Sequence, residues 1–450
     1  MYTKRHHSAL LILLGFFLSA PLFAQVHEFK LRNGLKLLVK EDHRAPVVVA
    51  QIWYKVGSSY EHNGITGVSH VLEHMMFKGT EKFDPGEFSK IIAANGGREN
   101  AFTAKDYTAY FQQLEASRLP ISFEMEADRM RNLTLPIGEF KKEAAVVMEE
   151  RRMRTDDNPR SKTYEQFYAT AFNSNPYGQP IIGWMNDLKN LNVDDLQVWY
   201  EKWYAPNNAT LVVVGDVKPK EVLKLAERYY GNLQRSHNIK PLKPRREPDQ
   251  DGLRHVKVEA PARLPYLLMG YKVPVVKTAD ADWEPYALEV LAGVLSSGAS
   301  ARFDKKLVRE KQIAAQVSAG YNLYARQSEL FVIDATPAAG QSVDSVQQAI
   351  KGELELLKTQ PVTQQELDRI KAQVVASKVY EKDSLFYQAM QMGTLETVGL
   401  GWQRLDEYPD KVRAVTAEQI MQVAKKYLVE KTLTVAELVP VSMNQAEMKN

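Results

Sequence analysis

Residues 70–74 read His-Val-Leu-Glu-His, and this pentapeptide constrains the chain more than any other segment. On a helix, His70 and His74 lie one turn apart on one face, about 6 Å along the axis. Their imidazoles can then converge on one Zn²⁺, with Glu73 beside them to take the proton of a metal-bound water. The alternative is a surface helix with two solvated histidines. Apolar neighbours instead indicate a packed helix, in which a metal accounts for the buried histidines: Val71, Leu72, Met75, Met76 and Phe77.

Further motifs accompany the pentapeptide in a fixed order. Glycines precede it at positions 57, 64 and 67, and Met-Met-Phe-Lys-Gly-Thr follows it at 75–80. The later segments are Asn-Ala-Phe-Thr at 100–103, Glu-Ala-Ala-Val-Val-Met-Glu-Glu at 143–150, Pro-Tyr-Gly-Gln-Pro-Ile-Ile-Gly at 176–183, and Tyr204 to Asp216. Together they closely resemble the pitrilysin/insulinase-like zinc metallopeptidases, or inverzincins. The match is best with the short bacterial branch that resembles the mitochondrial processing peptidase, and it is stronger in the first half of the chain.

The resemblance implies one Zn²⁺ per chain with three protein ligands: His70, His74 and Glu150. It gives Glu73 the role of general base and favours Glu150 over the neighbouring Glu149, because Glu150 follows Glu143 by seven residues. Seven residues are nearly two helical turns, so both carboxylates face the same way. Glu143 is then expected to be a second catalytic carboxylate, which orients a ligand or the attacking water. Glu149 is better explained as part of a solvated, charged helix face.

A short strand is predicted directly after the Gly96-Gly97 turn. In relatives the equivalent edge strand pairs with the substrate backbone. Such pairing depends on main-chain hydrogen bonds and therefore tolerates varied substrate side chains. The alternative is an ordinary exposed edge strand. The expected substrate-binding residues of this strand are Asn100, Ala101 and Phe102.

The second half departs from the family pattern at one position. Active relatives often contribute an Arg and, seven residues later, a Tyr, and both bind the substrate. Here Arg309 is present, but position 316 is Gln. Arg309 is therefore either a substrate-binding residue or a surface helix charge.

The chain also shows a weak internal repeat. Residues 191–214 are similar to residues 415–435, and in each a capped amphipathic helix leads into a β-branched strand. With strand-rich openings in both halves and the family resemblance, the repeat predicts an α+β fold of two homologous domains, each a mainly antiparallel sheet packed with helices. The second half has no histidine after His255, so it is expected to be inactive. The expected boundaries are 1–24 for a signal peptide, 25–235 for the zinc-binding domain, 236–252 for a linker and 253–450 for the inactive domain.

The N-terminus is typical of an exported protein. Lys4 and Arg5 precede an apolar run from Ala9 to Phe23, and Ala24 offers a small residue for cleavage. The chain has no cysteine, which suits an oxidising periplasm, with secretion beyond it as the alternative. No other segment is long and apolar enough to span a membrane. Removing Lys4 and Arg5 lowers the formal charge from +3 to +1, which gives no indication of nucleic-acid binding.

These observations predict an exported zinc metalloendopeptidase that hydrolyses short or unfolded peptides. The longest relatives close four such domains into a chamber, so a chain with two is expected to need a second chain. Because this chain lacks the Arg/Tyr pair, we expect a heterodimer with a zinc-less homologue, with a homodimer as the alternative. The alternative function is a zinc-retaining binding or assembly subunit, since some relatives act structurally.

Overall fold

The computed structural model describes residues 25–442 except 241–242, 244 and 382. The predicted signal peptide, 1–24, lies outside the described residues. Within the described part, no helix combines the length and apolarity needed to cross a membrane.

The first half of the chain builds a six-stranded sheet whose order is β1-β2-β6-β3-β5-β4. All neighbouring strands are antiparallel except β2 and β6, which are parallel. β3 and β6 read as nearly continuous apolar runs because helices cover both faces of the sheet. The strands are β1 Val26–Lys30, β2 Lys36–Glu41, β3 Val47–Tyr54, β4 Arg98–Thr103, β5 Thr108–Glu115 and β6 Ala209–Gly215.

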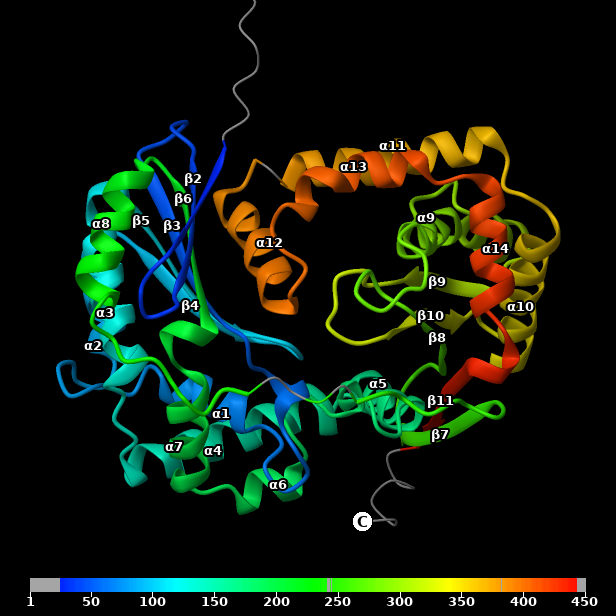
Figure 1. The fold of residues 1–450 in the computed structure, drawn as a ribbon. Helices are drawn as coiled ribbons and strands as arrows, with labels where there is room; N and C mark the ends of the chain where they lie inside the picture. Colours follow the sequence, from blue (N-terminus) through cyan, green and yellow to red (C-terminus); the bar gives the residue numbers. More distant parts are fainter. Residues whose placement is uncertain (1–24, 241–242, 244, 382, 443–450) are drawn as a thin grey trace, which may run out of the picture.

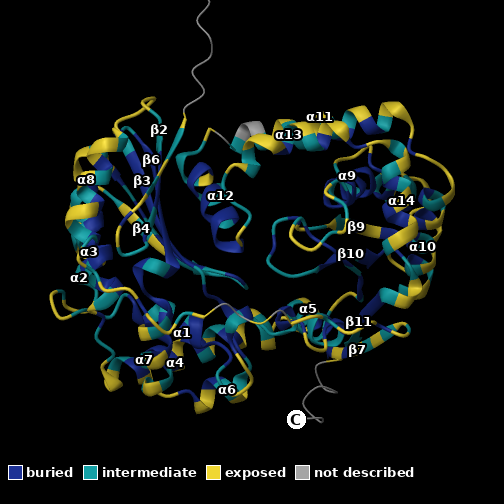
Figure 2. Cartoon of the chain, viewed as in Figure 1, coloured by how far each residue is buried: buried dark blue, intermediate teal, exposed yellow. Residues whose placement is uncertain are grey.

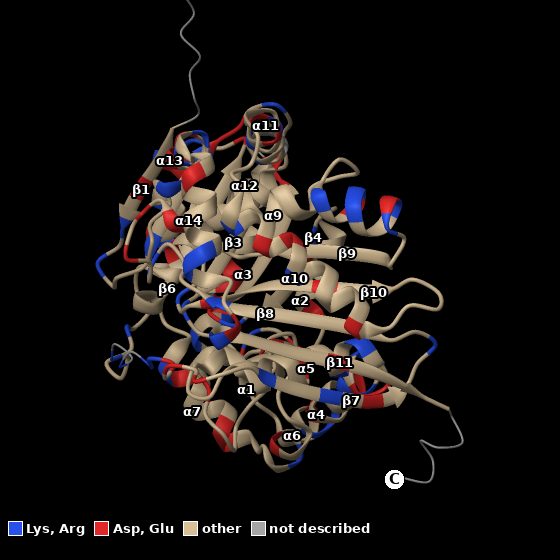
Figure 3. Cartoon of the chain, turned by 90° about the vertical axis from the view of Figure 1, so that its right-hand side faces the viewer, with Lys and Arg blue, Asp and Glu red and all other residues tan. Residues whose placement is uncertain are grey.

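The second half builds a five-stranded sheet of the same design. Its order is β7-β11-β8-β10-β9, and the only parallel pair among these described strands is β7 with β11. Figure 3 shows this order from β9 at the top to β7 at the bottom. In both sheets the last strand of the half inserts between earlier ones, which confirms the predicted pair of homologous, mainly antiparallel domains. The strands are β7 Arg254–Pro261, β8 Tyr266–Val273, β9 Ala314–Gly320, β10 Glu329–Pro337 and β11 Leu433–Val441.

Helices form the outer layers of both domains. The first sheet packs against α3 and α8, and α1 packs against α4 and α7; the second sheet packs against α9, α10 and α14. The helices of the first half are α1 Val68–Met75, α2 Glu87–Ala94, α3 Leu119–Arg131, α4 Ile137–Arg151, α5 Pro159–Ala171, α6 Met185–Asn190, α7 Val193–Trp203 and α8 Pro219–Tyr230. Those of the second half are α9 Glu284–Ser296, α10 Val343–Thr359, α11 Gln364–Glu381, α12 Leu385–Val398, α13 Arg404–Ala414 and α14 Ala417–Tyr427.

The repeated helix–strand unit has the same start signal in both halves. α7 begins with a capping box between Asn192 and Asp195, and α14 with one between Thr416 and Gln419. Each box satisfies backbone N–H groups at the first turn. Each helix then leads into the strand that completes its sheet, β6 or β11. The repeat seen in the sequence is therefore a structural repeat.

Each half also sends one helix across to the sheet of the other half (Figure 1). α12 covers β3 and β6, where Ala389 and Met392 join Trp53 in one buried cluster. α5 covers β7 and β11, where Phe167 and Ala171 lie in a cluster with residues of the second sheet. Figure 2 shows the packed sides of these helices and strands as buried. These two crossing helices, α5 and α12, pack the two halves of the chain against each other.

Candidate metal centre

The His-Val-Leu-Glu-His segment forms most of α1, as predicted, and its apolar face is fully packed. Val71, Leu72 and Met75 are buried in the core of the first domain. The buried carboxyl of Glu61 accepts hydrogen bonds from the N–H groups of Gly67 (2.7 Å) and Ser69 (2.9 Å). These contacts satisfy backbone donors that the first turn would otherwise leave unpaired. The N-terminal turn of α1 is thus anchored to Glu61, and the apolar face of the helix is buried in the core.

α1 and α4 bring three metal-binding side chains together. Ligand atoms of His70, His74 and Glu150 all lie within 4.8 Å of one another. His70 Nε2 lies 3.9 Å from Glu150 Oε1, and His74 Nε2 lies 3.5 Å from Glu150 Oε2. Ligands of a tetrahedral zinc site with bonds near 2.0–2.1 Å are separated by roughly 3.4 Å. The three side chains therefore need only small adjustments to hold one zinc ion.

The chemistry of the donors also fits zinc. Burial, followed by the neighbouring His74, lowers the pKa of His70 to about 3, so its ring stays neutral and able to coordinate. Two imidazole nitrogens and one carboxylate oxygen are a typical catalytic set, which leaves a fourth position for water or substrate.

Glu143 and Glu149 lie on different faces of α4. Glu143 is buried, and its Oε2 lies 3.1 Å from His74 Nδ1, while Lys78 Nζ lies 2.8 Å from its Oε1. A carboxylate on the far nitrogen of a ligand histidine fixes the ring orientation and raises its basicity. Glu149 is exposed and pairs with Arg152 at 2.6 Å. This placement agrees with the choice of Glu150 over Glu149.

Glu73 lies on α1 between the two histidines and faces strand β4. Thr103 Oγ1 donates a hydrogen bond to Glu73 Oε2 at 2.5 Å. Burial raises the pKa of Glu73, and the Thr103 hydroxyl partly opposes this rise. A carboxylate of raised pKa beside a metal site is suited to accept a proton near neutral pH.

The metal-binding side chains open into a cavity of ≈ 780 Å³. Asn100, Ala101 and Phe102 line one wall, and they belong to β4, which lies at the edge of its sheet as predicted. A second cavity of ≈ 790 Å³ adjoins the first and extends to the second domain. Both cavities are lined by Lys105, Tyr164, Tyr168, Tyr177 and Ile181.

Buried polar contacts between the halves hold the wall between these cavities. Asp106 accepts hydrogen bonds from Ser59 (2.7 Å), from Arg326 Nε (3.1 Å) and from Tyr177. Lys105 Nζ reaches Glu329 Oε1 at 3.3 Å. Arg326 and Glu329 come from the second half of the chain, so the second domain fixes the loop that follows β4.

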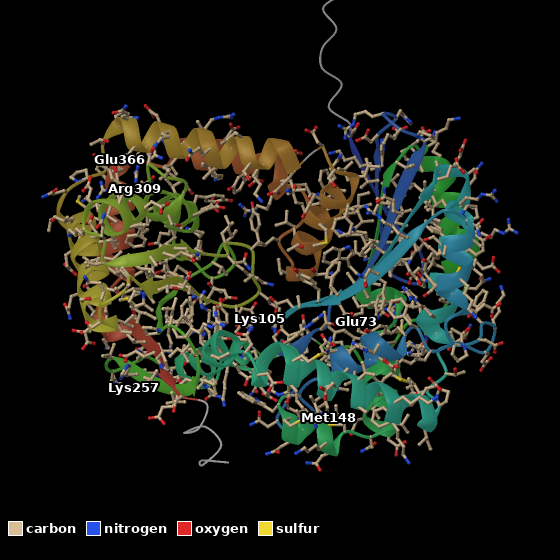
Figure 4. All side chains as sticks on the ribbon, turned by 180° about the vertical axis from the view of Figure 1, so that it is seen from behind. Glu73, Lys105, Met148, Lys257, Arg309 and Glu366 are labelled. Carbon is tan, nitrogen blue, oxygen red and sulfur yellow. The ribbon has the colours of Figure 1, made fainter. Side chains whose placement is uncertain are left out.

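Arg309 lies elsewhere. It belongs to the π-helical turn Asp304–Glu310, where its guanidinium donates a hydrogen bond to the Ala299 carbonyl. Figure 4 shows Arg309 and Glu73 on opposite sides of the molecule. Among the described residues that line the two cavities, Arg309 does not occur. Nothing in this part of the structure supports its predicted contact with substrate.

Two further residues reach the centre without having been singled out in the sequence. Arg154 pairs with the carboxylate of Glu150 and lines the cavity. Its spacing of four from Glu150 could have indicated this, because residues four apart are neighbours on a helix. Thr103 reaches Glu73 from a different element, and no local pattern connects the two.

Sequence and structure comparisons agree on the family of the chain. The model of the insulinase family (peptidase family M16) matches residues 36–184, and that of the peptidase M16 inactive domain matches residues 190–374. The zinc protease PqqE of Helicobacter pylori is 32% identical over 96% of this chain and 97% of its own length.

Solved structures extend the comparison. The crystal structure of a protease from Helicobacter pylori has a TM-score of 0.87 and 31% identity, and covers 93% of this chain and 100% of that one. The periplasmic protease PqqL from Escherichia coli has a TM-score of 0.78 and 18% identity; the match covers 94% of this chain but 48% of that one. On these findings, the chain belongs to the insulinase family of peptidases, family M16.

Proposed function

We propose that this chain is an exported zinc metalloendopeptidase that hydrolyses short or unfolded peptides. The observation that carries the proposal is the convergence of His70, His74 and Glu150 beside Glu73, in a cavity walled by an edge strand. We assign residues 25–235 to the zinc-binding peptidase domain and 253–450 to an inactive homologous domain, joined by a linker at 236–252.

The proposed ligands are His70, His74 and Glu150, with Glu143 holding the ring of His74 through Nδ1. A bound Zn²⁺ supplies Lewis acidity, which lowers the pKa of water to about 7 and polarises a peptide carbonyl. Glu73 acts as general base: its carboxylate takes the proton of the attacking water and passes it to the leaving amine. Burial favours this role because it raises the pKa of Glu73.

The substrate is proposed to bind as an extended strand along β4. The outer edge of β4 is not paired with another strand of the described sheet, so its backbone groups can pair with a peptide. Asn100, Ala101 and Phe102 are the residues of this contact. Main-chain pairing needs an extended segment and therefore selects short or unfolded peptides over folded proteins.

The proposed location is the periplasm. Support comes from the basic and apolar N-terminus and from the absence of cysteine in the sequence. The Escherichia coli relative of similar fold is described as a periplasmic protease.

We further propose that the active form pairs two such chains, as a heterodimer with a zinc-less homologue or, alternatively, as a homodimer. The chain corresponds to 48% of the Escherichia coli protein, which therefore has room for two such units in one chain. Arg309 lies away from the cavities of its own chain, and a partner that supplies an Arg/Tyr pair would complete the site.

The test is cleavage of a quenched fluorescent peptide library by wild type and Glu73→Gln, each alone and with a co-encoded homologue. Zinc content is measured on the same samples. Zinc-dependent cleavage that disappears in Glu73→Gln supports the proposed peptidase activity. Full activity of the chain alone would contradict the proposed heterodimer. Bound zinc without cleavage under either condition would overturn the peptidase and favour a binding or assembly subunit.

A further inference from the structure

We propose that Thr103 is a positioning residue that holds Glu73 in the orientation needed for proton transfer. The inference rests on the proposed function, since it concerns the base of that reaction. Its physical basis is the hydrogen bond from Thr103 Oγ1 to Glu73 Oε2, at 2.5 Å. Among the described residues, Thr103 is the one that donates a hydrogen bond to the Glu73 carboxylate.

A glutamate side chain has three rotatable bonds, and an unrestrained carboxylate distributes over several rotamers. One donated hydrogen bond engages Oε2 and leaves Oε1 available to accept a proton. A misplacement of about 1 Å at a reacting group can reduce a rate by roughly 100-fold. Thr103 therefore determines how often Glu73 is correctly placed.

The backbone of Thr103 is itself tightly fixed. It is the last residue of β4, paired with Thr108 of β5, and the next residue, Ala104, donates its N–H to the Tyr107 carbonyl at 2.8 Å. Thr108 in turn donates its hydroxyl to the Val56 carbonyl at 2.9 Å. Asp106, within the same turn, is held by residues from both halves of the chain. A rigid hairpin is a suitable support for a group that must orient a base.

The position of Thr103 also connects two parts of the proposed site. The strand whose edge is expected to receive the peptide at 100–102 ends in the residue that holds the base. A peptide that pairs with β4 is therefore placed relative to Glu73 through one short, continuous segment of backbone.

The direct test compares Thr103→Val, which keeps the shape and removes the donor, with Thr103→Ser, which keeps the hydroxyl. Thr103→Val is expected to bind zinc normally and keep the wild-type KM, because the peptide is held by backbone groups, while kcat falls roughly 10- to 100-fold. Thr103→Ser is expected to retain most of kcat. Thr170→Val is the matched control: it makes the same change on α5, where the hydroxyl donates to the Gln166 carbonyl at 2.7 Å and lies outside the hairpin that carries Thr103.

A double variant separates a positioning role from a general loss of structure. Glu73→Asp shortens the side chain away from Thr103 and is expected to leave a low, measurable activity. If Thr103 acts through Glu73, adding Thr103→Val to Glu73→Asp lowers kcat no further. Equal fold losses in the two backgrounds would overturn the inference.

A structural readout does not depend on activity or on zinc. A crystal structure of Thr103→Val should show the Glu73 carboxylate displaced or in several conformations, and an unchanged carboxylate would contradict the inference. Failure of the proposed function is distinguishable: zinc-loaded wild type would then cleave no peptide. Wild-type cleavage with an undiminished kcat in Thr103→Val would refute the role of Thr103 alone.

Discussion

The two halves of this chain share a topology of five strands, to which the first half adds β1, but they differ at the first α-helix between the central strand and the edge strand. α1 lies between β3 and β4, and α9 lies between β8 and β9, the corresponding place in the second half. α1 carries His70, Glu73 and His74, whereas α9 is largely apolar and carries two acidic residues, Glu284 and Glu289. The comparison shows that both halves provide the same scaffold, but only the first half carries the candidate catalytic and metal-binding side chains, which lie on α1 and α4.

The largest effect is expected from removing a histidine of α1. His70→Ala or His74→Ala should abolish zinc binding and lower kcat/KM by roughly 10⁴-fold or more, since the Lewis acid is lost with its ligand. The matched control is His255→Ala in the second half, where His255 pairs with Glu437 at 2.7 Å. Zinc analysis and peptide cleavage check both, and equal losses in the control would break the assignment of the chemistry to the first half.

The carboxyls of the two corresponding helices give the next comparison. Glu73→Gln should keep zinc and lower kcat by roughly 10²- to 10⁴-fold, because the proton acceptor is removed. Glu289→Gln, the change on α9, should leave kcat unaltered. Steady-state kinetics with zinc analysis distinguish them, and a near-normal kcat for Glu73→Gln would show that another group is the base.

The exchanged helices predict a stability effect. A Cβ added at Gly393 of α12 would overlap the Trp53 ring of the first sheet. Gly393→Ala should therefore destabilise the folded protein by about 1–3 kcal/mol through overpacking. Gly352→Ala, on the open face of α10, meets no atom within 4 Å and should be neutral or stabilise by about 0.5–1 kcal/mol. Denaturant unfolding measures both, and equal effects would argue against the tight docking of α12.

The smallest expected effect concerns pH and the carboxyl of Glu289 on α9. Burial raises the pKa of Glu289 from 4.5 to about 7, so the folded protein retains a proton that the unfolded chain releases. This stabilisation is complete below about pH 4.5 and is lost as pH rises through 7. Glu289→Gln should thus gain thermal stability relative to wild type between pH 5 and 8. If Tm depended on pH in the same way for the two proteins, the pKa of Glu289 would not be raised by folding.

The sequence predicts the parts of this account that depend on local pattern. The apolar periodicity around His70 and His74, the seven-residue spacing of Glu143 and Glu150, and the capped helices before β6 and β11 all depend on near neighbours in the chain. Each of these predicted elements occurs in the structure as a helix or strand.

What the sequence did not predict depends on long-range packing. The docking of α5 and α12 on the opposite sheets joins residues that are far apart in the chain, and no periodicity specifies that partner. The contact between Thr103 and Glu73 arises in the same way, from two elements that meet only in the folded domain. Arg309 shows the converse: resemblance to the family's arginine suggested a site contact although the Tyr at the family spacing is missing, and the residue lies outside the two cavities.

The most direct test of the central claim is a zinc titration of chelator-treated protein, followed by cleavage of an unfolded peptide with the suspected partner present. We predict that activity rises linearly and saturates at one zinc per chain, and that His74→Ala shows neither tight binding nor cleavage. No cleavage at any zinc concentration, or unchanged tight binding in His74→Ala, would contradict a catalytic zinc site built by α1 and α4.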